Sequence, residues 1–258
     1  MIRKIKKIFL RDYFTNKVKI RSRRGLALLL RYRNYIDRKL VMYERYENQQ
    51  IEFLIKLIEL NRVDTFLDVG ANFGLYALSI AGQCPRVSQI LAFEPDVDNY
   101  YHLCGNIFVN GFSQKIKTYR LGISDRQGTV KFLKNAGSSS GTSRILETAP
   151  ASTKNQRFDE VEIDISSLDI LLPAFKAQTI ALKIDVEGHE FKVFSGARRL
   201  LTDNRCLLQV EILDNAEQAV EAICAGYQMK CICNLGSDYY FSNFEIQGCE
   251  LNGPQGRM

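Results

Sequence analysis

Most of the chain alternates between short apolar runs and stretches of helical periodicity. Apolar runs of strand length occupy residues 65–69, 89–93, 116–121, 180–184 and 207–213. Helical patterns lie beside them at residues 47–60, 75–82, 97–109, 189–201 and 216–225. This alternation predicts an α/β fold in which helices cover both faces of a mostly parallel sheet.

The pattern changes towards the end of the chain and in one earlier segment. Residues 226–233 and 239–244 flank a turn that contains Gly236, which predicts an antiparallel hairpin at the edge of the sheet. Residues 129–133 and 158–165 predict two further short strands. Residues 135–155 between them are rich in small and hydroxyl side chains, and a loop of this length is typical of a lid or a substrate-binding segment.

Charge divides the chain into a basic arm and a mildly acidic body. Residues 1–39 hold 14 lysines and arginines against Asp12 and Asp37, a net charge of +12, whereas the rest of the chain has a net charge of −6. We therefore expect a basic, largely helical arm over residues 1–42, followed by one α/β domain over residues 43–258.

The first 14 residues interleave isoleucines and aromatic side chains with lysines and arginines at near-helical spacing. Such a basic amphipathic segment can lie on an anionic membrane surface, pack against a second copy of the chain in a homo-oligomer, or end in solvent. The sequence leaves these three alternatives open.

Cysteine usage and hydropathy bear on the cellular compartment. The seven cysteines are scattered and mostly lie beside apolar runs, as is typical of reduced, buried thiols. No apolar run approaches the roughly 20 residues that span a bilayer, and the start lacks a signal-peptide cleavage site. We expect a cytoplasmic protein, with peripheral attachment at the inner membrane surface as an alternative.

A glycine-rich turn follows the first strand of the predicted domain. Gly70 and Gly74 enclose Ala71 and Asn72, and Asp68 precedes the first glycine by two positions. The turn leaves backbone N–H groups at a helix N-terminus, where few side chains block a ligand. The spacing lacks the three glycines of a dinucleotide fingerprint and the lysine of a P-loop. It resembles the first motif of S-adenosylmethionine (SAM) methyltransferases instead.

Acids also follow the next two strands. Glu94, before the turn at Pro95, has the geometry to bind both hydroxyls of a ribose. Asp68 can accept hydrogen bonds near the ammonium end of such a cofactor. After the third strand, Asp125 either accepts a hydrogen bond from an adenine amino group or forms an Asx-turn that leads to Gly128.

The fourth predicted strand ends in a cluster of ionisable residues. Asp185, Glu187 and His189 lie there together with Lys183 and Glu190. Because the carboxyl ends of parallel strands meet at one edge of the sheet, these side chains should face the cofactor. We predict Asp185 as the group nearest the methyl and as the first candidate for the catalytic base, with Glu187 and His189 as further candidates.

Taken together, these motifs resemble the FkbM-type methyltransferase family. The resemblance covers roughly residues 43–213 and leaves residues 1–40 out. It rests on segments in the family's order and spacing, of which the block at residues 183–188 is the most specific. The segments are residues 68–74, Phe93-Glu94-Pro95, Gly122-Ile123-Ser124-Asp125 with Gly128, residues 138–141, Ser167-Leu168-Asp169, residues 183–190 and Gly196-Ala197.

The resemblance implies a class I Rossmann-like fold with a seven-stranded sheet, SAM as the cofactor, and methyl transfer to a hydroxyl of a sugar, glycan or small metabolite. The family's upstream Tyr-Glu pair falls on Tyr46 and Glu47, with Tyr43 and Glu44 as a competing alignment. The cofactor contacts that it implies are Glu47, Asp68, Gly70, Ala71, Asn72, Gly74, Glu94, Pro95, Ser124, Asp125 and Asp185.

Two other functions stay open. The basic arm could clamp phosphates in a nucleic-acid methyltransferase, or the chain could methylate a protein; the acidic body and the missing Asn-Pro-Pro-Tyr motif disfavour nucleic acid. The chain could also be a non-catalytic SAM-binding protein that docks on a membrane or partner, although the acids after the fourth strand argue against this.

A divalent metal between Asp185 and Glu211 would have only two carboxylate ligands, so we expect no metal site.

Overall fold

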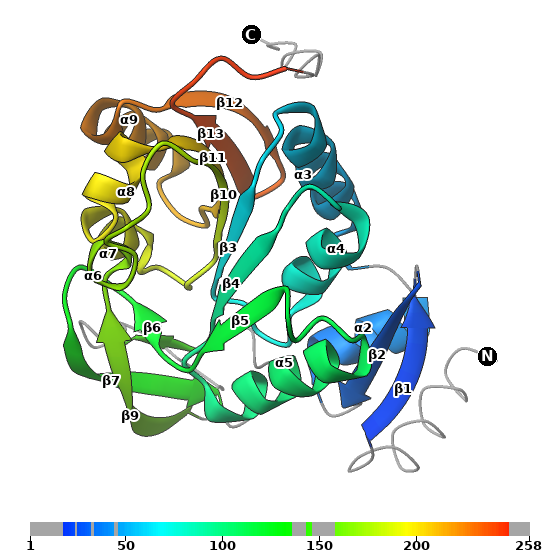
Figure 1. Cartoon of the computed structure of the whole chain (residues 1–258). Coiled ribbons are helices and arrows are strands. Elements are labelled where there is room, and N and C mark those ends of the chain that lie inside the picture. Colours follow the sequence, from blue (N-terminus) through cyan, green and yellow to red (C-terminus); the bar gives the residue numbers. More distant parts are fainter. Residues whose placement is uncertain are drawn as a thin grey trace, which may run out of the picture.

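A seven-stranded sheet forms the centre of the computed structural model, which describes residues 18–23, 25–31, 34–43, 46–135, 143–145 and 158–247 (Figure 1). In spatial order its strands are β12 (Lys230–Leu235), β13 (Asp238–Ser242), β11 (Arg205–Glu211), β10 (Thr179–Ile184), β3 (Thr65–Val69), β4 (Gln89–Phe93) and β5 (Ile116–Tyr119). Only β13 runs against the other strands of this sheet, because β11 and β12 both pair with it in antiparallel fashion. The predicted mostly parallel sheet with a C-terminal hairpin is therefore confirmed.

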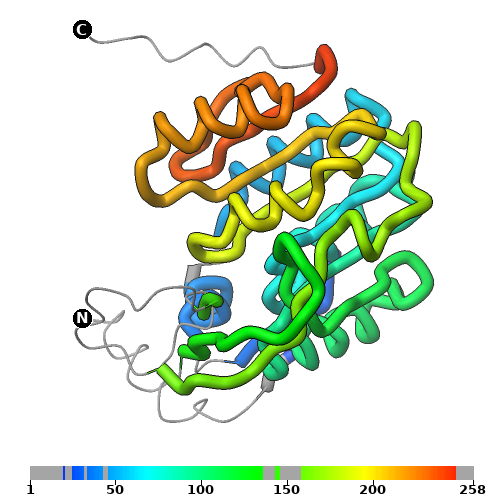
Figure 2. Tube along the Cα trace, turned by 90° about the vertical axis from the view of Figure 1, so that its left-hand side faces the viewer, coloured from blue at the N-terminus to red at the C-terminus, as the bar shows by residue number. Residues whose placement is uncertain are grey.

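Helices cover both faces of this sheet, and Figure 2 is viewed from the side of the second group, with α9 in orange. The first group is α3 (Asn48–Leu60), α4 (Leu75–Gln83) and α5 (Val97–Val109), and the second is α6 (Leu168–Leu171), α7 (Glu190–Ser195), α8 (Arg198–Asp203) and α9 (Ala216–Tyr227). Strand β3 serves both cores, since Phe66 packs with the first group and Leu67 and Val69 with the second. All five residues of β3 are buried, as is usual for a central parallel strand. Among the described residues, no helix combines the length and apolar character that a bilayer crossing requires.

A smaller sheet of four strands stands beside the first. Its order is β6 (Gly122–Ile123), β9 (Phe158–Ser166), β7 (Gly128–Asn135) and β8 (Arg144–Ile145). Strands β7 and β9 confirm the two short strands that the sequence predicts. Of the predicted lid at residues 135–155, only Asn135 and residues 143–145 lie within the described ranges, so its role stays a prediction.

One helix that the sequence predicts as continuous is interrupted in the structure. Residues 189–201 form the two short helices α7 and α8, which are separated at Gly196 and Ala197. A Cβ atom at Gly196 would lie 2.0 Å from the carbonyl oxygen of Ser124. The helical period of residues 189–201 does not reveal this close approach of a strand, and the glycine is the residue that permits it.

The described part of the N-terminal arm differs from the largely helical arm that the sequence predicts. Strands β1 (Val18–Arg23) and β2 (Leu26–Arg31) form an antiparallel hairpin, which α2 (Tyr35–Tyr43) follows. Leu26, Leu28 and Leu30 are buried and join the core of α3 and α4, whereas the residues between them are partly exposed. The prediction is therefore wrong for residues 18–31, because a run of five apolar residues conceals the two-residue period. The amphipathic pattern of residues 1–14 lies outside the described residues.

Two polar side chains of α5, together with Asn110 at its C-cap, bind the backbone of β2. Asn110 Oδ1 accepts a hydrogen bond from the Ala27 amide at 2.8 Å, and Asn110 Nδ2 donates to the Ala27 carbonyl at 2.7 Å. One turn earlier, Asn106 Oδ1 accepts from the Leu29 amide at 2.7 Å, and His102 Nε2 donates to the Leu29 carbonyl. Since these side chains are four residues apart, one helix face satisfies the backbone groups of a strand edge.

Asn106 also reaches the turn that follows β3. Its Nδ2 donates to the carbonyl oxygen of Phe73 at 2.9 Å, while its Oδ1 holds the Leu29 amide. The Asn106 side chain is fully buried. A single amide group therefore connects the arm hairpin with the glycine turn.

Candidate active site

A pocket opens at the carboxyl ends of β3, β4 and β10, and its volume is about 1050 Å³ with the open mouth included. This is the edge of a parallel sheet at which ligands bind in open α/β folds. Seven predicted site residues line it: Glu47, Gly70, Asn72, Glu94, Pro95, Asp185 and Glu187.

The glycine turn holds the strand ends close together. Gly70 has a φ angle of 85°, and a Cβ atom there would lie 1.9 Å from the carbonyl oxygen of Asp185. The amides of Gly70 and Ala71 donate to the Phe93 carbonyl at 3.0 and 2.9 Å. Only glycine fits at position 70, because the backbone of β10 passes directly beside it.

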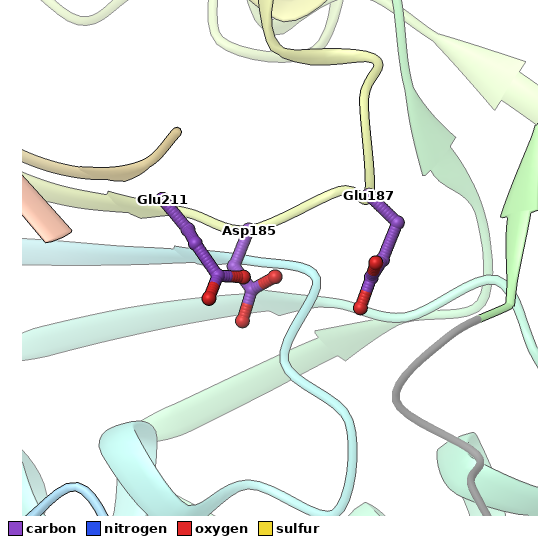
Figure 3. A group of neighbouring side chains, drawn as sticks. All are labelled: Asp185, Glu187 and Glu211. Carbon is purple, nitrogen blue, oxygen red and sulfur yellow. The ribbon is translucent and has the colours of Figure 1, made fainter. Parts of the chain in front are cut away.

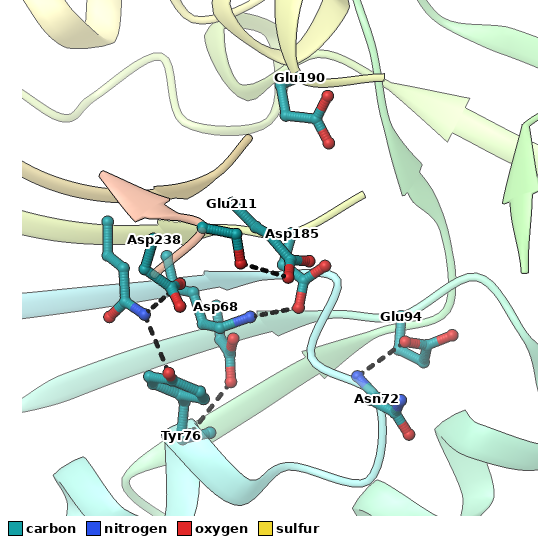
Figure 4. A network of polar contacts seen from close by, with 12 residues as sticks. Asp68, Asn72, Tyr76, Glu94, Asp185, Glu190, Glu211 and Asp238 are labelled. Atoms are coloured by element: carbon teal, nitrogen blue, oxygen red, sulfur yellow. Dashed lines mark hydrogen bonds and ion pairs between the residues drawn. The ribbon is translucent and has the colours of Figure 1, made fainter. Parts of the chain in front are cut away.

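Glu94 is a buried carboxyl group whose two oxygens are both held by backbone amides. Oε2 accepts from the Asn72 amide at 2.8 Å (Figure 4). Oε1 accepts from the Asp96 amide, also at 2.8 Å. Burial raises the pKa of Glu94 to about 8. Since a carboxylate oxygen can accept more than one hydrogen bond, Glu94 can still accept bonds from ligand hydroxyls in the pocket.

Lys183 lies behind the pocket wall and neutralises the acids around it. Its Nζ is 2.6 Å from Asp185 Oδ2. Burial alone would lower the pKa of Lys183, but the carboxyl groups of Asp185, Glu47 and Asp68 raise it above its usual value.

Asp68 does not line the pocket; its Oδ2 accepts a hydrogen bond from the Ala77 amide at 3.0 Å and so caps α4. Burial raises the pKa of Asp68 to about 6.

Three carboxyl groups converge at the ends of β10 and β11 (Figure 3). Asp185, Glu187 and Glu211 each offer an oxygen, and these atoms lie within 4.8 Å of one another. Burial, and after it the charge of Asp185, raises the pKa of both Glu187 and Glu211 to about 8. Glu211 and Asp185 share a hydrogen bond, which requires one proton between two carboxyl groups (Figure 4). The sequence predicts no metal site, yet this set could hold a divalent cation or move a proton.

Three residues of the pocket wall have a left-handed backbone. They are Glu47, Asn72 and Glu187, with φ angles of 49°, 51° and 54°. Such a conformation costs a residue other than glycine about 1–2 kcal/mol. Strained residues of this kind cluster at functional sites, where the surrounding structure holds them in place.

The wall beside Glu94 is apolar. Phe93, Leu121, Ile123, Phe132 and Ile145 line it, from the main sheet, the smaller sheet and the chain between them. The sequence does not single out this surface as a place for a flat base, because its members come from segments that are far apart along the chain.

The structure places three predicted site residues next to the pocket wall rather than in it. His189 and Ser124 are buried, and His189 Nε2 lies 2.9 Å from Ser124 Oγ. Asp125 Oδ2 accepts a hydrogen bond from Lys192 Nζ at 2.8 Å, which holds the pKa of Asp125 below its usual value. These contacts join β6 to α7. Among the described contacts of Asp125, neither an Asx-turn nor a contact with the pocket is found.

Gly74 and Ala71 also lie outside the wall. Gly74 begins α4 with a φ angle of 92°, and a Cβ atom there would lie 2.5 Å from Leu103 Cδ1. Ala71 is buried against β4. Both residues shape the turn through packing.

The N-terminal arm supplies pocket residues that the sequence does not predict. Tyr35 and Ile36 of α2 line the pocket together with Tyr46, which precedes the predicted Glu47. Of the two Tyr-Glu alignments, the pair at Tyr46 and Glu47 lies in the pocket wall, while Glu44 is outside the described residues. No motif marks Tyr35 and Ile36, because the arm carries no resemblance to the family.

Known proteins resemble this chain over most of the domain. The family model described as "Methyltransferase FkbM domain" matches residues 68–230. The hexuronic acid methyltransferase AglP of Haloferax volcanii is 27% identical over 157 residues, which are 61% of this chain and 59% of AglP. The chain thus matches less than two thirds of the length of that relative.

Two solved structures have a distant likeness to the chain. The methyltransferase FkbM from Methylobacillus flagellatus KT is 15% identical, with a TM-score of 0.49, and the match covers 70% of this chain and 44% of that one. Methanocaldococcus jannaschii Trm5 in complex with adenosine is 12% identical, with a TM-score of 0.47, and covers 89% and 56%. Both TM-scores are below 0.5, so these likenesses carry no conclusion about ligand or substrate.

Proposed function

Because the chain belongs to the FkbM methyltransferase family, whose cofactor is SAM, we propose that it transfers a methyl group to a hydroxyl oxygen of a sugar or glycan. The observation that carries the proposal is the pocket at the strand ends, where Glu94 and Asp185 lie in one wall. Glu94 comes from β4 and Asp185 from β10, on either side of β3.

The donor set fits the cofactor. Glu94 would accept hydrogen bonds from the ribose hydroxyls, and the apolar wall at Phe93, Leu121 and Ile123 would cover the adenine. Glu47 and Asp185, which lie near Lys183, would face the charged amino-acid end. When bound, SAM supplies an electrophilic methyl group, and the pocket has to hold an acceptor oxygen in line with it.

Asp185 is our candidate for the group that accepts the hydroxyl proton. The ammonium group of Lys183 lies 2.6 Å from Asp185 Oδ2, whereas burial raises the pKa of Glu211 to about 8, which leaves Glu211 mostly protonated at neutral pH. A weak base is sufficient, because the acceptor oxygen becomes strongly acidic while the new bond forms. Glu187 is the next candidate, since it also lines the pocket.

A sugar is the acceptor to test first. The relative AglP is a hexuronic acid methyltransferase, and this supports a carbohydrate acceptor for the present chain.

Transfer of radiolabelled methyl from SAM to a panel of glycosides tests the proposal. Asp185→Asn should lower kcat by about a hundredfold or more if Asp185 takes the proton. Asp214→Asn serves as the matched control, because Asp214 is an exposed acid on the loop after β11. Transfer to none of the glycosides by the wild-type protein contradicts the proposed acceptor class, and undiminished turnover by Asp185→Asn contradicts the proposed base.

A further inference from the structure

The N-terminal arm and the chain that follows it form part of the pocket wall, and they present two tyrosines there. Tyr35 lies on α2 and Tyr46 lies on the chain between α2 and α3, and both line the pocket. The Tyr35 side chain is 43% exposed, so its ring is available to a ligand. Aromatic rings at a carbohydrate site stack against the apolar face of a sugar ring, which makes this wall suited to the acceptor.

The ammonium group of Lys39 lies over both of these rings. Its Nζ is 4.5 Å from the centroid of the Tyr35 ring and 5.5 Å from that of the Tyr46 ring. Lys39 follows Tyr35 by four residues on α2, so both side chains project from one face of the helix. Cation–π contacts of this kind hold an ammonium group in place and leave its hydrogen-bond donors open.

Apart from these two ring contacts, the charge of Lys39 has no ionic partner in the part of the chain that the structure describes. None of the ion pairs found there involves Lys39, although it is half-buried. Lys183 differs, since it is bound to Asp185 and surrounded by further acids. A half-buried ammonium group beside a ligand pocket attracts an anionic group of the ligand.

Lys39 forms no described ion pair with a carboxyl group of the pocket. Asp185, the acid of that pocket with an ion pair, is bound to Lys183 instead. The described pocket lining contains no lysine, arginine or histidine, and Lys39 is the cation that stands directly against two of its rings.

We propose that Lys39 binds a carboxylate on the methyl acceptor, with the sugar ring against Tyr35 and Tyr46, so that the acceptor is an acidic sugar. This inference rests on the proposed function, because it assigns the substrate class of the same site. The carboxylate could instead be the one on the methionine part of the cofactor, and the experiment separates the two sources.

The test compares acceptors that differ only in the carboxylate. The probes are p-nitrophenyl β-glucuronide with p-nitrophenyl β-glucoside, and the galacturonide with the galactoside. The variants are Lys39→Met, which removes the charge and keeps an unbranched side chain, and Lys39→Arg, which keeps the charge. Lys56→Met on α3 is the matched control, because Lys56 is exposed and does not line the pocket. Calorimetry with S-adenosylhomocysteine measures cofactor binding in each variant.

We expect the wild-type protein to prefer the uronides. Lys39→Met should lower kcat/KM for uronides by about tenfold to a hundredfold, mostly through KM, because a hydrogen bond to a charged group is lost. The neutral glycosides should change less than about threefold. Lys39→Arg should retain most of the activity on uronides, Lys56→Met should match the wild type, and the Kd of S-adenosylhomocysteine should stay within about twofold in all variants.

Three outcomes would overturn the inference while leaving the proposed function in place. They are a wild-type preference for the neutral glycosides, an equal loss on both acceptor classes in Lys39→Met, and weaker binding of S-adenosylhomocysteine by Lys39→Met. The last of these would assign the carboxylate to the cofactor. Transfer to neither class by the wild-type protein contradicts the proposed function, and this inference with it.

Discussion

The two walls of the pocket are built in different ways. The wall at the strand ends consists of short segments that directly follow β3, β4 and β10, and Gly70, Glu94 and Asp185 hold their places through backbone contacts within the sheet. The arm wall consists of Tyr35, Ile36 and Tyr46, and side chains of α5 and its C-cap attach the preceding hairpin to the domain. Backbone geometry fixes the first wall, and a few polar side chains fix the second.

We infer that this difference separates binding of the cofactor from choice of the acceptor. A wall that the sheet holds in place can serve the same cofactor in many proteins, since it depends on strand order and glycine positions. A wall that an N-terminal segment supplies can change without any change in the sheet. We therefore expect substitutions in the first wall to affect S-adenosylhomocysteine binding, and substitutions in the arm to affect the acceptor.

The largest effect should come from Gly70→Ala, compared with Gly25→Ala in the hairpin turn. Both glycines have positive φ angles, 85° and 81°, but a Cβ atom at Gly70 meets the Asp185 carbonyl, whereas nothing lies within 4 Å of one at Gly25. Gly70→Ala should lower the free energy of unfolding by about 4 kcal/mol or more, and Gly25→Ala by about 1–2 kcal/mol. Urea unfolding measures both, and equal losses would contradict the close contact at Gly70.

The next effect should come from Asn106→Ala. It leaves the Leu29 amide and the Phe73 carbonyl without their partner, which should cost about 2–4 kcal/mol of unfolding free energy. Asn110→Ala is the matched variant, because Asn110 binds β2 but not the glycine turn. Only Asn106→Ala should also weaken S-adenosylhomocysteine binding in calorimetry. If both variants weaken it alike, the two walls are not as separate as described.

A smaller effect is expected from Glu94→Gln. The pKa of about 8 means that Glu94 is mostly protonated at pH 7 and ionised above pH 8. Because the ionised form accepts hydrogen bonds better, wild-type affinity for S-adenosylhomocysteine should rise as pH passes through 8. Glu94→Gln should bind about tenfold more weakly at pH 9 and lack this rise. The control is Glu221→Gln on the exposed face of α9, and affinity that is constant from pH 6 to 9 would contradict the prediction.

The same group sets a pH dependence of stability. A carboxyl group whose pKa is raised in the folded state contributes stability below its unfolded pKa, and this contribution is lost as pH rises through the folded value. The free energy of unfolding should therefore fall between about pH 4.5 and 8, and it should fall less in Glu94→Gln. Urea titrations at several pH values measure this difference.

The smallest effect on turnover is expected from His189→Asn. The structure places His189 against Ser124, outside the pocket wall, so kcat should change by less than about threefold. Stability should fall by about 1 kcal/mol through the lost hydrogen bond. A hundredfold loss of kcat at unchanged S-adenosylhomocysteine affinity would restore His189 as a candidate for the base.

Sequence patterns predict the first wall well because its determinants are local. Strand β3, its glycine turn and Glu94 lie within 30 residues of one another, and parallel strands bring their ends to one edge. The pair of Ser124 and His189 shows where this reasoning ends. Both residues follow strands, as predicted, yet the register of β6 with β9 and the break at Gly196 turn them towards each other.

In the second wall, only Tyr46 belongs to a predicted motif, and Tyr35 and Ile36 belong to none. The apolar run at residues 26–30 is too short to show a period, and the three side chains of α5 and its C-cap that bind β2 lie more than 70 residues away in the sequence. Glu211 illustrates the same limit. The sequence identifies Glu211 as an acid at a strand end. It does not reveal that Glu211 shares a hydrogen bond with Asp185, or that Lys183 also binds the Asp185 carboxyl group.

The amide group of Asn106 gives the arm a thermodynamic link to the cofactor. Its two hydrogen bonds end at Leu29 in the arm and at Phe73 in the glycine turn. A coupling free energy is mutual. A ligand that stabilises the turn must therefore also stabilise the hairpin, and a partner that displaces the hairpin must weaken the binding of that ligand. Deuterium uptake at the Leu29 amide should therefore fall when S-adenosylhomocysteine binds, although Leu29 itself lies outside the pocket wall.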